Sequence, residues 1–398
     1  MLHEKIRAIA HSVYNNRDTT GTESSLLGGN AGIALFFAYL TIAYPEGPYE
    51  EITLEYLEKM SDALADQQLS HHLSTGIAGI AFVFQHLRNI GLLDNSEDIG
   101  LGALDESIVA GAEQDFTLGN WDPLHGLVAL GIYFLERYKE TGESQQLERI
   151  VDQLDALAVS EKGGKAWITR GFRQYSRDNY NFGMAHGMPG LLSFLAAVYT
   201  LGIRKTVIEA LIPSCCTFLL GHYQEKGGHY AFPGSIELKP QRTPLPSRNG
   251  WCYGDLGMAL TLIRCGKALT REDWVERGTG IALKTTQIPF EATRCDDASF
   301  CHGAIGLAHQ YDRLYRSTSD TRFKAAATTW LALSHEHYYR PDIYPGGYAY
   351  RQYDEATGSY ANRTSYGLLE GISGIGLVLL SSEGTIPPDW DIIFQTNI

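Results

Sequence analysis

Cysteine and histidine recur at matching positions in this chain, and together they can bind a metal ion. Cys252 lies two residues before Gly254, and Cys301 lies two residues before Gly303. His302 directly follows Cys301. Zinc prefers thiolate and imidazole ligands, and three protein ligands leave the open fourth position that is typical of catalytic zinc sites. The three residues therefore predict a catalytic zinc site.

Other polar residues occupy related positions. His186 directly precedes a glycine, as His302 does, and Asp122 lies four residues before another glycine. Arg248 lies four residues before Cys252, where it can bind a carboxylate or a carbonyl near a metal. If the segments that carry these residues converge, their side chains meet at one site.

Each of these residues also has an ordinary structural explanation. A cysteine before an apolar helix is usually a small buried hydrophobic residue. A lone histidine is more often a core residue than a ligand, and Arg248 can be an exposed loop charge. Cys295 precedes two aspartates but lies outside the register of the other cysteines, so we do not count it as a ligand. The alignment of several reactive residues at the same positions is what favours a site.

A glycine motif that recurs seven times defines these positions. The first glycines of its copies are Gly29, Gly76, Gly126, Gly187, Gly254, Gly303 and Gly371. A second glycine follows three residues later, except in the third copy, where Ala129 takes its place. Intervals of 47 to 68 residues between copies fit one helical hairpin per repeat, with insertions in the longer intervals.

Two kinds of helix are predicted between and after the glycine motifs. Residues 32–43, 79–87 and 374–380 follow a motif and are apolar nearly all round, whereas residues 50–67 and 143–157 have apolar residues at helical spacing between polar ones. The contrast predicts buried inner helices and amphipathic outer helices. We therefore expect an all-α fold, an α/α toroid of about seven helical hairpins in two layers, with each motif at the N-terminus of an inner helix.

Three segments break the helical rhythm. Residues 163–182, 223–249 and 337–366 are rich in glycine, proline and tyrosine or alternate apolar and polar residues. This composition predicts loops with short strands that lie over one end of the barrel. We expect residues 1–398 to form a single domain with an insertion at about residues 223–249.

Composition excludes several classes of protein. The net charge of −14 disfavours nucleic-acid binding and favours a cationic partner. Six cysteines without a Cys-x-x-Cys pair predict neither a disulfide scaffold nor a zinc ribbon. The first sixteen residues are polar and charged, which predicts no secretory signal, and the apolar runs are too short to cross a bilayer. We expect a cytoplasmic protein.

The motifs together resemble those of the lanthionine synthetase C-like family. They are the glycine repeats with Trp251-Cys252-Tyr253-Gly254, Cys301-His302-Gly303 and Ala185-His186-Gly187. The resemblance extends from Gly28 to Gly374 and is strongest to the stand-alone cyclases of class I lanthipeptide (lantibiotic) biosynthesis, of the nisin cyclase type. It implies an α/α toroid with zinc at its centre.

The resemblance also implies roles for individual residues. It places the zinc ligands at Cys252, Cys301 and His302 and the acid–base histidine at His186, with Asp122 near that histidine. Arg248 and Tyr253 match the site arginine and the site tyrosine of the family. Ala129 departs from the pattern, so we expect a slightly different turn in the third repeat. Residues 223–249 are the candidate segment for holding the peptide.

The implied activity is zinc-dependent lanthipeptide cyclisation. Such a cyclase activates peptide cysteine thiols for Michael-type addition to dehydroalanine or dehydrobutyrine and forms lanthionine or methyllanthionine thioether rings. Its substrate is a dehydrated lanthipeptide precursor. The resemblance further implies that a dehydratase and an exporter join it in a complex at the membrane, where it would be peripheral.

Three alternatives remain at this point. A family relative that does not cyclise would bind peptide or glutathione thiols with the same zinc ligands. A zinc-dependent protein prenyltransferase-like enzyme would need an aspartate ligand and a basic diphosphate pocket, which the net charge of −14 disfavours. A glycosidase-like toroid would need paired carboxylates. Asp122 and Glu370 are available for that role, but the Cys-His set would then have no explanation.

Overall fold

The computed structural model describes residues 2–17, 23–95, 99–170, 177–225, 228–239, 247–355 and 357–398, and most of them lie in α-helices. Strands in this part of the chain are few and short. The all-α prediction is therefore confirmed.

A buried helix follows each glycine motif. These helices are α2 (Asn30–Ala43), α4 (Ile77–Asn89), α6 (Leu127–Thr141), α8 (Met188–Thr200), α10 (Asp255–Ala268), α12 (Ala304–Thr318) and α14 (Ile372–Glu383). In each of them the first glycine of the motif is the N-cap residue. Eleven of the fourteen residues of α2 are buried, as its apolar sequence predicts. The motifs thus begin the helices that we expected them to begin.

The remaining α-helices bury one face and expose the other. They are α1 (Leu2–Asn15), α3 (Tyr49–Asp66), α5 (Leu101–Leu118), α7 (Gln145–Leu157), α9 (Lys205–Leu220), α11 (Glu272–Thr285) and α13 (Thr321–Leu333). In α7 the buried side chains include Leu147, Ile150 and Leu154, which recur every three or four residues. Such a stripe can cover a buried helix while its opposite face meets solvent.

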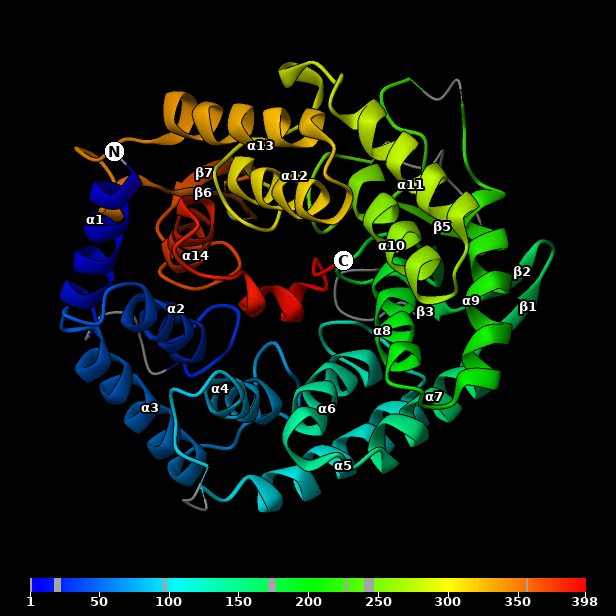
Figure 1. Cartoon of the computed structure of the whole chain (residues 1–398), viewed down its shortest axis with the longest axis horizontal. Helices are drawn as coiled ribbons and strands as arrows, with labels where there is room; N and C mark the ends of the chain where they lie inside the picture. The colour runs from blue at the N-terminus through cyan, green and yellow to red at the C-terminus, as the bar shows by residue number, and fades with distance from the viewer. Residues whose placement is uncertain are drawn as a thin grey trace. The chain divides into compact units, whose positions relative to one another are not determined.

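The chain divides into two compact units. Unit 1 comprises Met1–Leu104, Cys295–Asp391 and Asn397, and unit 2 comprises Asp105–Arg294, Ile392–Thr396 and Ile398. Within unit 1, α2 packs on α3, α12 on α13 and α14 on α1, and within unit 2, α6 packs on α7, α8 on α9 and α10 on α11 (Figure 1). The buried helices also pack on one another: α2, α4, α12 and α14 form contacts in unit 1, and α6, α8 and α10 form contacts in unit 2. Each unit therefore has an inner and an outer layer.

Short strands occur in the three segments that break the helical rhythm. Antiparallel pairs join β1 (Val159–Glu161) to β2 (Gly164–Ala166) and β6 (Tyr350–Asp354) to β7 (Ser359–Arg363). A third sheet has the order β3 (Ile168–Thr169), β4 (Asn179–Asn181) and β5 (Ser235–Glu237). Short 3-10 or π turns are η1 (Phe290–Ala292), η2 (Ser334–Tyr338), η3 (Pro345–Gly347) and η4 (Asp389–Phe394). Of the predicted segments, residues 171–176, 226–227, 240–246 and 356 lie outside the described residues.

The turn before a buried helix folds back on itself. The backbone N–H of Ala304, the first residue of α12, donates to the carbonyl of Asp297 at 3.0 Å, and a bond of the same spacing precedes α2, α4 and α6. The approach is so close that a Cβ on Gly303 would lie 2.2 Å from the backbone nitrogen of Ser299. Glycine is required there because it alone has no Cβ. The residues just before each motif glycine are thereby held in a tight, defined loop.

Two copies of the motif show how strictly this turn is kept. Gly254 has φ +137°, a conformation that other residues rarely adopt, and it follows directly on Cys252 and Tyr253. In the third copy we expected Ala129 to alter the turn, and this expectation was wrong. Gly126 has φ −144° and ψ −157°, nearly the values of Gly76 in the second copy. Ala129 already lies inside α6, where alanine suits the helix and its methyl group is buried.

No described helix combines the length and the apolar composition that a bilayer crossing requires.

Candidate functional site

Unit 2 brings the turn of the fifth repeat against the turn of the fourth. The backbone N–H of Ala185 donates to the carbonyl of Cys252 at 3.4 Å. A Cβ on Gly183 would lie 2.5 Å from the same carbonyl oxygen, so this approach depends on glycine. Cys252 is buried, and its charge when ionised acts on His186. Two of the predicted site residues are therefore neighbours.

His186 and Asp122 form a hydrogen-bonded pair in unit 2. Nδ1 of His186 lies 2.8 Å from Oδ2 of Asp122. The other oxygen of Asp122, Oδ1, accepts the backbone N–H groups of Leu124 at 2.8 Å and of His125 at 2.9 Å. Because an ionised carboxylate can only accept, the imidazole donates from Nδ1. The carboxylate thus fixes both the orientation of the ring and the position of one of its protons.

The pair shifts the protonation of both partners toward the charged forms. Burial by itself would lower the pKa of His186, but the charge and the hydrogen bond of Asp122, with a smaller effect of Cys252, raise that pKa above its ordinary value. Burial would raise the pKa of Asp122, yet the charge and hydrogen bond of His186 outweigh it and the net pKa of Asp122 is lowered. The arrangement favours an imidazolium next to a carboxylate. The imidazolium can donate a proton, and the carboxylate fixes its position.

A second histidine accompanies this pair. The ring of His125 stacks on the ring of His186, with centroids 5.7 Å apart and planes inclined by 18°. Ligand atoms of Asp122, His125 and His186 all lie within 4.8 Å of one another. His125 precedes its glycine by one residue, as His186 does, so the register of the repeat brings the two rings together.

Tyr253 and Arg248 are also ordered within unit 2. The side-chain amide of Asn181 donates to the hydroxyl oxygen of Tyr253 at 3.0 Å. Arg248 donates from one terminal nitrogen to the backbone carbonyl of Arg294 at 2.8 Å. The buried Nε of Arg248 has no hydrogen-bond partner among the described residues. Arg248 is therefore a half-buried cation that is anchored to the backbone at one terminal nitrogen.

The predicted insertion at residues 223–249 is tied to the helix that begins after Cys252. Asp255, in the first turn of α10, accepts the backbone N–H groups of Ala231 at 2.6 Å and of Phe232 at 3.0 Å. Burial raises the pKa of Asp255 to about 6, although these two hydrogen bonds oppose the shift. Hydrogen bonds therefore join the described part of the insertion to the start of α10, three residues after Cys252.

Cys301 and His302 lie in unit 1, in the turn before α12. The backbone N–H of Cys301 donates to the carbonyl of Leu369 at 3.1 Å, which joins this turn to the turn before α14. Cys301 is half-buried, whereas the other five cysteines are buried. The predicted ligand set thus draws Cys252 from unit 2 and the Cys301–His302 pair from unit 1.

A buried carboxylate in the same turn binds the histidine. Oδ2 of Asp297 lies 3.2 Å from Nε2 of His302 and accepts the backbone N–H of Arg351 at 2.8 Å. Oδ1 accepts the backbone N–H of Ser299 at 2.9 Å and its hydroxyl at 2.8 Å. Burial would raise the pKa of Asp297, but the hydrogen bond and charge of His302 and the backbone N–H groups lower it. Asp297 is therefore an ionised, fully hydrogen-bonded group.

Sequence reasoning missed Asp297, although its position carries a signal. Asp297 lies six residues before the first glycine of its motif, and Asn120, Asn181 and Ser365 lie at the same position in other repeats. These are residue types whose short polar side chains bind the backbone of tight turns. An acid at that position, in the repeat that also carries His302, could have been noticed.

Comparison with known proteins accords with this geometry. The family model described as "Lanthionine synthetase C-like protein" matches residues 20–395. The nisin biosynthesis protein NisC of Lactococcus lactis subsp. lactis is 23% identical over 384 residues, which cover 92% of this chain and 86% of that protein. The solved structure of nisin cyclase matches with a TM-score of 0.78 and 22% identity and covers 98% of this chain and 97% of its own. Nisin cyclase is an α/α toroid, so the predicted fold class is confirmed.

Proposed function

The chain belongs to the lanthionine synthetase C-like family, and on that premise we propose that it is a zinc-dependent lanthipeptide cyclase. The observation that carries this proposal within the family is the Asp122–His186 pair beside Cys252. The addition of a peptide thiol to a dehydrated residue would use a proton donor for the α-carbon, and a zinc ion held by thiol ligands such as Cys252 would activate the peptide thiol. The names of the similar proteins, a nisin biosynthesis protein and nisin cyclase, support the same activity.

The proposed reaction joins two side chains of one peptide. A cysteine thiol of the precursor loses its proton, and the sulfur adds to the β-carbon of a dehydroalanine or dehydrobutyrine. The carbon–carbon double bond becomes a single bond, and the electron pair moves to form an enolate. A proton then adds to the α-carbon. The product is a lanthionine or methyllanthionine ring, with no net loss or gain of atoms.

The candidate zinc ligands are Cys252, Cys301 and His302. Two thiols and one imidazole are a donor set that suits zinc. The local structure of His302 fits this role, because Oδ2 of Asp297 lies next to Nε2 of the ring. A metal-binding histidine usually donates the N–H of its second ring nitrogen to a carboxylate or a carbonyl. Bound zinc would lower the pKa of a peptide thiol, so that thiolate is present near neutral pH.

His186 is the proposed donor of the proton to the α-carbon. Its raised pKa keeps a larger fraction of the ring protonated at neutral pH, and Asp122 holds the ring by Nδ1. The proton that reaches the substrate would come from Nε2. Asp122 acts by orienting and stabilising the imidazolium.

Arg248 and Tyr253 are proposed to stabilise the enolate oxygen. Arg248 presents a guanidinium whose position is fixed by the carbonyl of Arg294. Tyr253 is held at its hydroxyl by Asn181. Donors that are already oriented stabilise developing charge without a cost of reorganisation.

The proposed substrate is a dehydrated lanthipeptide precursor, and residues 223–249 are proposed to help hold it. The net charge of −14 would favour a cationic core peptide, an attraction that added salt should weaken. We further propose that a dehydratase and an exporter bind this protein in a complex, so that it works in the cytoplasm at the membrane surface.

The activity can be tested with purified protein, zinc and a dehydrated precursor. Cyclisation removes free thiols without a change in mass, so mass spectrometry after thiol alkylation measures it. We expect the wild-type protein to protect the cysteines from alkylation, and Cys301→Ala to lose both zinc and this protection. Cys215→Ala is the matched control, because Cys215 is a buried cysteine of α9.

Two results would contradict the proposal in different ways. Ring formation by a metal-free protein at the wild-type rate would exclude the role of zinc. A wild-type protein that binds zinc and thiols but leaves all precursor cysteines open to alkylation would be a non-cyclising relative that binds peptide or glutathione.

A further inference from the structure

The turn before α12 is built around the buried carboxylate of Asp297. Asp297 is buried and its two oxygens accept from four donors, one of which is the ring of His302. Two of the donors belong to Ser299 in the same turn, and one is the backbone N–H of Arg351 at the start of β6. The carboxylate therefore connects the histidine ring to two separate stretches of backbone.

Two other repeats build the corresponding turn without an acid, whereas the first repeat has Glu23 at this position, and Oε1 of Glu23 accepts the hydroxyl of Ser25 at 2.7 Å. In the fourth repeat the side-chain oxygen of Asn181 accepts the backbone N–H of Gly183 at 2.9 Å, and in the seventh the hydroxyl of Ser365 accepts that of Gly367 at 3.4 Å. Asp297 makes the equivalent bond to the backbone N–H two residues after it. A neutral side chain is sufficient for this bond, and burying a charge costs free energy unless it is well paired. In the sixth repeat the carboxylate has a further contact of this kind, the ring of His302 at 3.2 Å.

We propose that Asp297 is a positioning residue for metal binding, which holds the proton of His302 on Nε2 and so presents the Nδ1 lone pair to zinc. The inference rests on the proposed function, since it assumes that His302 is a zinc ligand. A carboxylate can accept from Nε2 but cannot donate to it, so only the tautomer with the proton on Nε2 satisfies the contact. A ligating nitrogen must carry no proton, which this tautomer ensures for Nδ1.

The substitution Asp297→Asn tests this directly. Asparagine is the residue that the fourth repeat uses in the same position, so the turn can still form. If its oxygen stays on Ser299, its NH2 group faces the N–H of Arg351 and Nε2 of His302. The ring would then accept at Nε2 and carry its proton on Nδ1, which blocks the metal. Partners of this kind typically change metal affinity 10- to 100-fold, so we expect zinc affinity to fall by about that factor.

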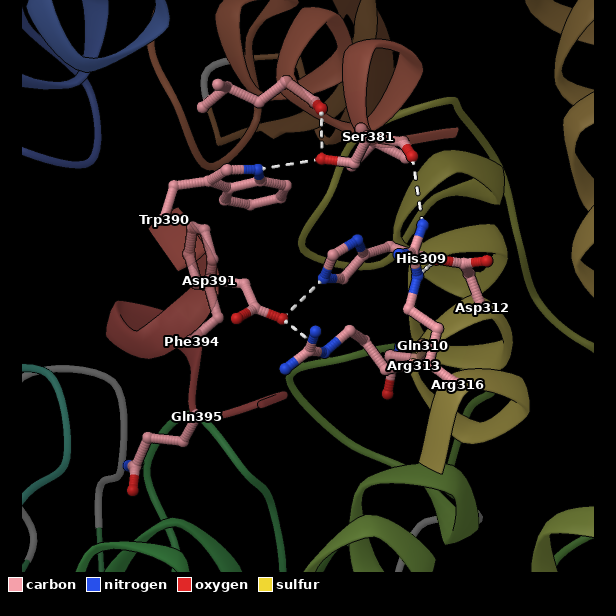
Figure 2. A network of polar contacts seen from close by, with 12 residues as sticks. His309, Gln310, Asp312, Arg313, Arg316, Ser381, Trp390, Asp391, Phe394 and Gln395 are labelled. Carbon is pink, nitrogen blue, oxygen red and sulfur yellow. Dashed lines mark hydrogen bonds and ion pairs between the residues drawn. The ribbon is translucent and has the colours of Figure 1, made fainter. Parts of the chain in front are cut away.

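A second buried acid in unit 1 provides the matched control (Figure 2). Asp391 is buried and its Oδ2 accepts from Nε2 of His309 at 2.9 Å and from Nε of Arg313 at 3.1 Å. It resembles Asp297 in burial and in its histidine partner, but that partner is not a predicted ligand. Asp391→Asn should lower the stability of the fold and leave zinc affinity within about twofold of the wild type.

The readout is zinc affinity, measured by competition with a chromophoric chelator on protein whose fold is checked by circular dichroism. The inference would be supported if Asp297→Asn binds zinc about 10- to 100-fold more weakly than the wild type while the zinc affinity of Asp391→Asn is unchanged. Wild-type affinity in folded Asp297→Asn, or equal losses in both variants, would overturn it. A wild-type protein that binds no zinc, or a Cys301→Ala variant that still binds zinc, would refute the proposed zinc site. That outcome is distinct from a failure of the inference about Asp297.

A measurement on the unsubstituted protein covers the case in which Asp297→Asn does not fold. Long-range proton–nitrogen NMR correlations of 15N-histidine report which ring nitrogen carries the proton. In the metal-free wild type we expect the proton of neutral His302 on Nε2, with the His302→Asn spectrum used to assign the signal. A proton on Nδ1 would contradict the inference.

Discussion

The turns of the fourth and sixth repeats each carry a histidine at the same position, yet their rings are bound through opposite nitrogens. His186 donates from Nδ1 to Asp122, which lies 64 residues earlier in the chain. His302 is bound at Nε2 by Asp297, which lies in its own turn. The first arrangement suits Nε2 for proton transfer, and the second suits Nδ1 for a metal. In one repeated turn, therefore, the position of the acid decides which ring nitrogen of the histidine it contacts.

The largest effect is expected from His186→Asn, which removes the proposed proton donor but leaves the predicted ligands in place. A general acid typically contributes about 10²- to 10⁴-fold, so we expect cyclisation of a dehydrated precursor to slow by about that factor. Zinc content, measured by mass spectrometry of the purified protein, should not change. His222→Asn is the matched control, because His222 lies in unit 2 and its Nδ1 hydrogen-bonds the carbonyl of Phe218 instead. Loss of zinc in His186→Asn would show that the two histidines do not have separate roles.

Asp122→Asn should have a smaller effect, which depends on pH. Asp122 raises the pKa of His186, so its removal lowers that pKa and the protonated form is lost at a lower pH. The rate, which needs the imidazolium, should therefore begin to fall at lower pH than in the wild type, with a loss of about tenfold per unit of pKa on the alkaline side. The pH dependence of the rate tests this, and an unshifted alkaline limb would mean that Asp122 does not act through His186.

The same pair also predicts how stability depends on pH, and the dependence has the opposite direction for His186 and for Asp122. The pKa of His186 is raised in the folded state, so its contribution is present at low pH and is lost as pH rises through the folded value. The pKa of Asp122 is lowered, so its contribution is lost as pH falls through its folded value. The pair therefore stabilises the fold most between these two values.

Asn181→Asp should have the smallest effect of these substitutions, and it is measured on stability. The substitution places an aspartate in the fourth repeat, at the position that Asp297 occupies in the sixth repeat. In the fourth repeat the side chain at this position contacts the hydroxyl of Tyr253 instead of a histidine. Asn181 is fully buried, and a carboxylate there would be a buried charge with only the hydroxyl of Tyr253 and the backbone N–H of Gly183 as donors. We expect the free energy of unfolding to fall by about 1–3 kcal/mol in denaturant titrations. Asn181→Ser, which imitates the seventh repeat without a charge, should cost less; an equal cost would mean that the charge is not the cause.

The glycine register was sufficient to predict where the buried helices begin. The prediction worked because the backbone approaches so closely at residues such as Gly303 that no side chain fits. Glycine is therefore required at these positions, and this requirement can be recognised from the sequence alone. Ala129 shows the limit of the argument, because the second position of the motif lies inside the helix and accepts a methyl group. The sequence also predicted the segments that contain the short strands, but not which strands pair.

The register of the repeat and the family resemblance supplied the candidate site residues, but not the contacts that these residues make. Nothing in the sequence shows which nitrogen of a histidine is bound, because that depends on the fold of the turn around His186 or His302. Asp297 was missed for the same reason, since an aspartate in a loop is ordinary until its neighbours are known. The placing of Asp122 beside His186 rested on family resemblance, and the hydrogen bond between them is a structural observation.

The packing of α1 against α14 has a consequence for how the protein is made. The apolar side chains of α1, among them Ile6, Ile9 and Val13, are fully buried in the folded protein, and α14 is one of the helices that pack on α1. On the ribosome α1 emerges long before α14, so at about 5–20 residues per second this face is made about 20–70 s before that partner. Most of unit 2 is a continuous stretch that emerges in between. We therefore expect the nascent chain to be a substrate for chaperones that bind the exposed apolar face of α1.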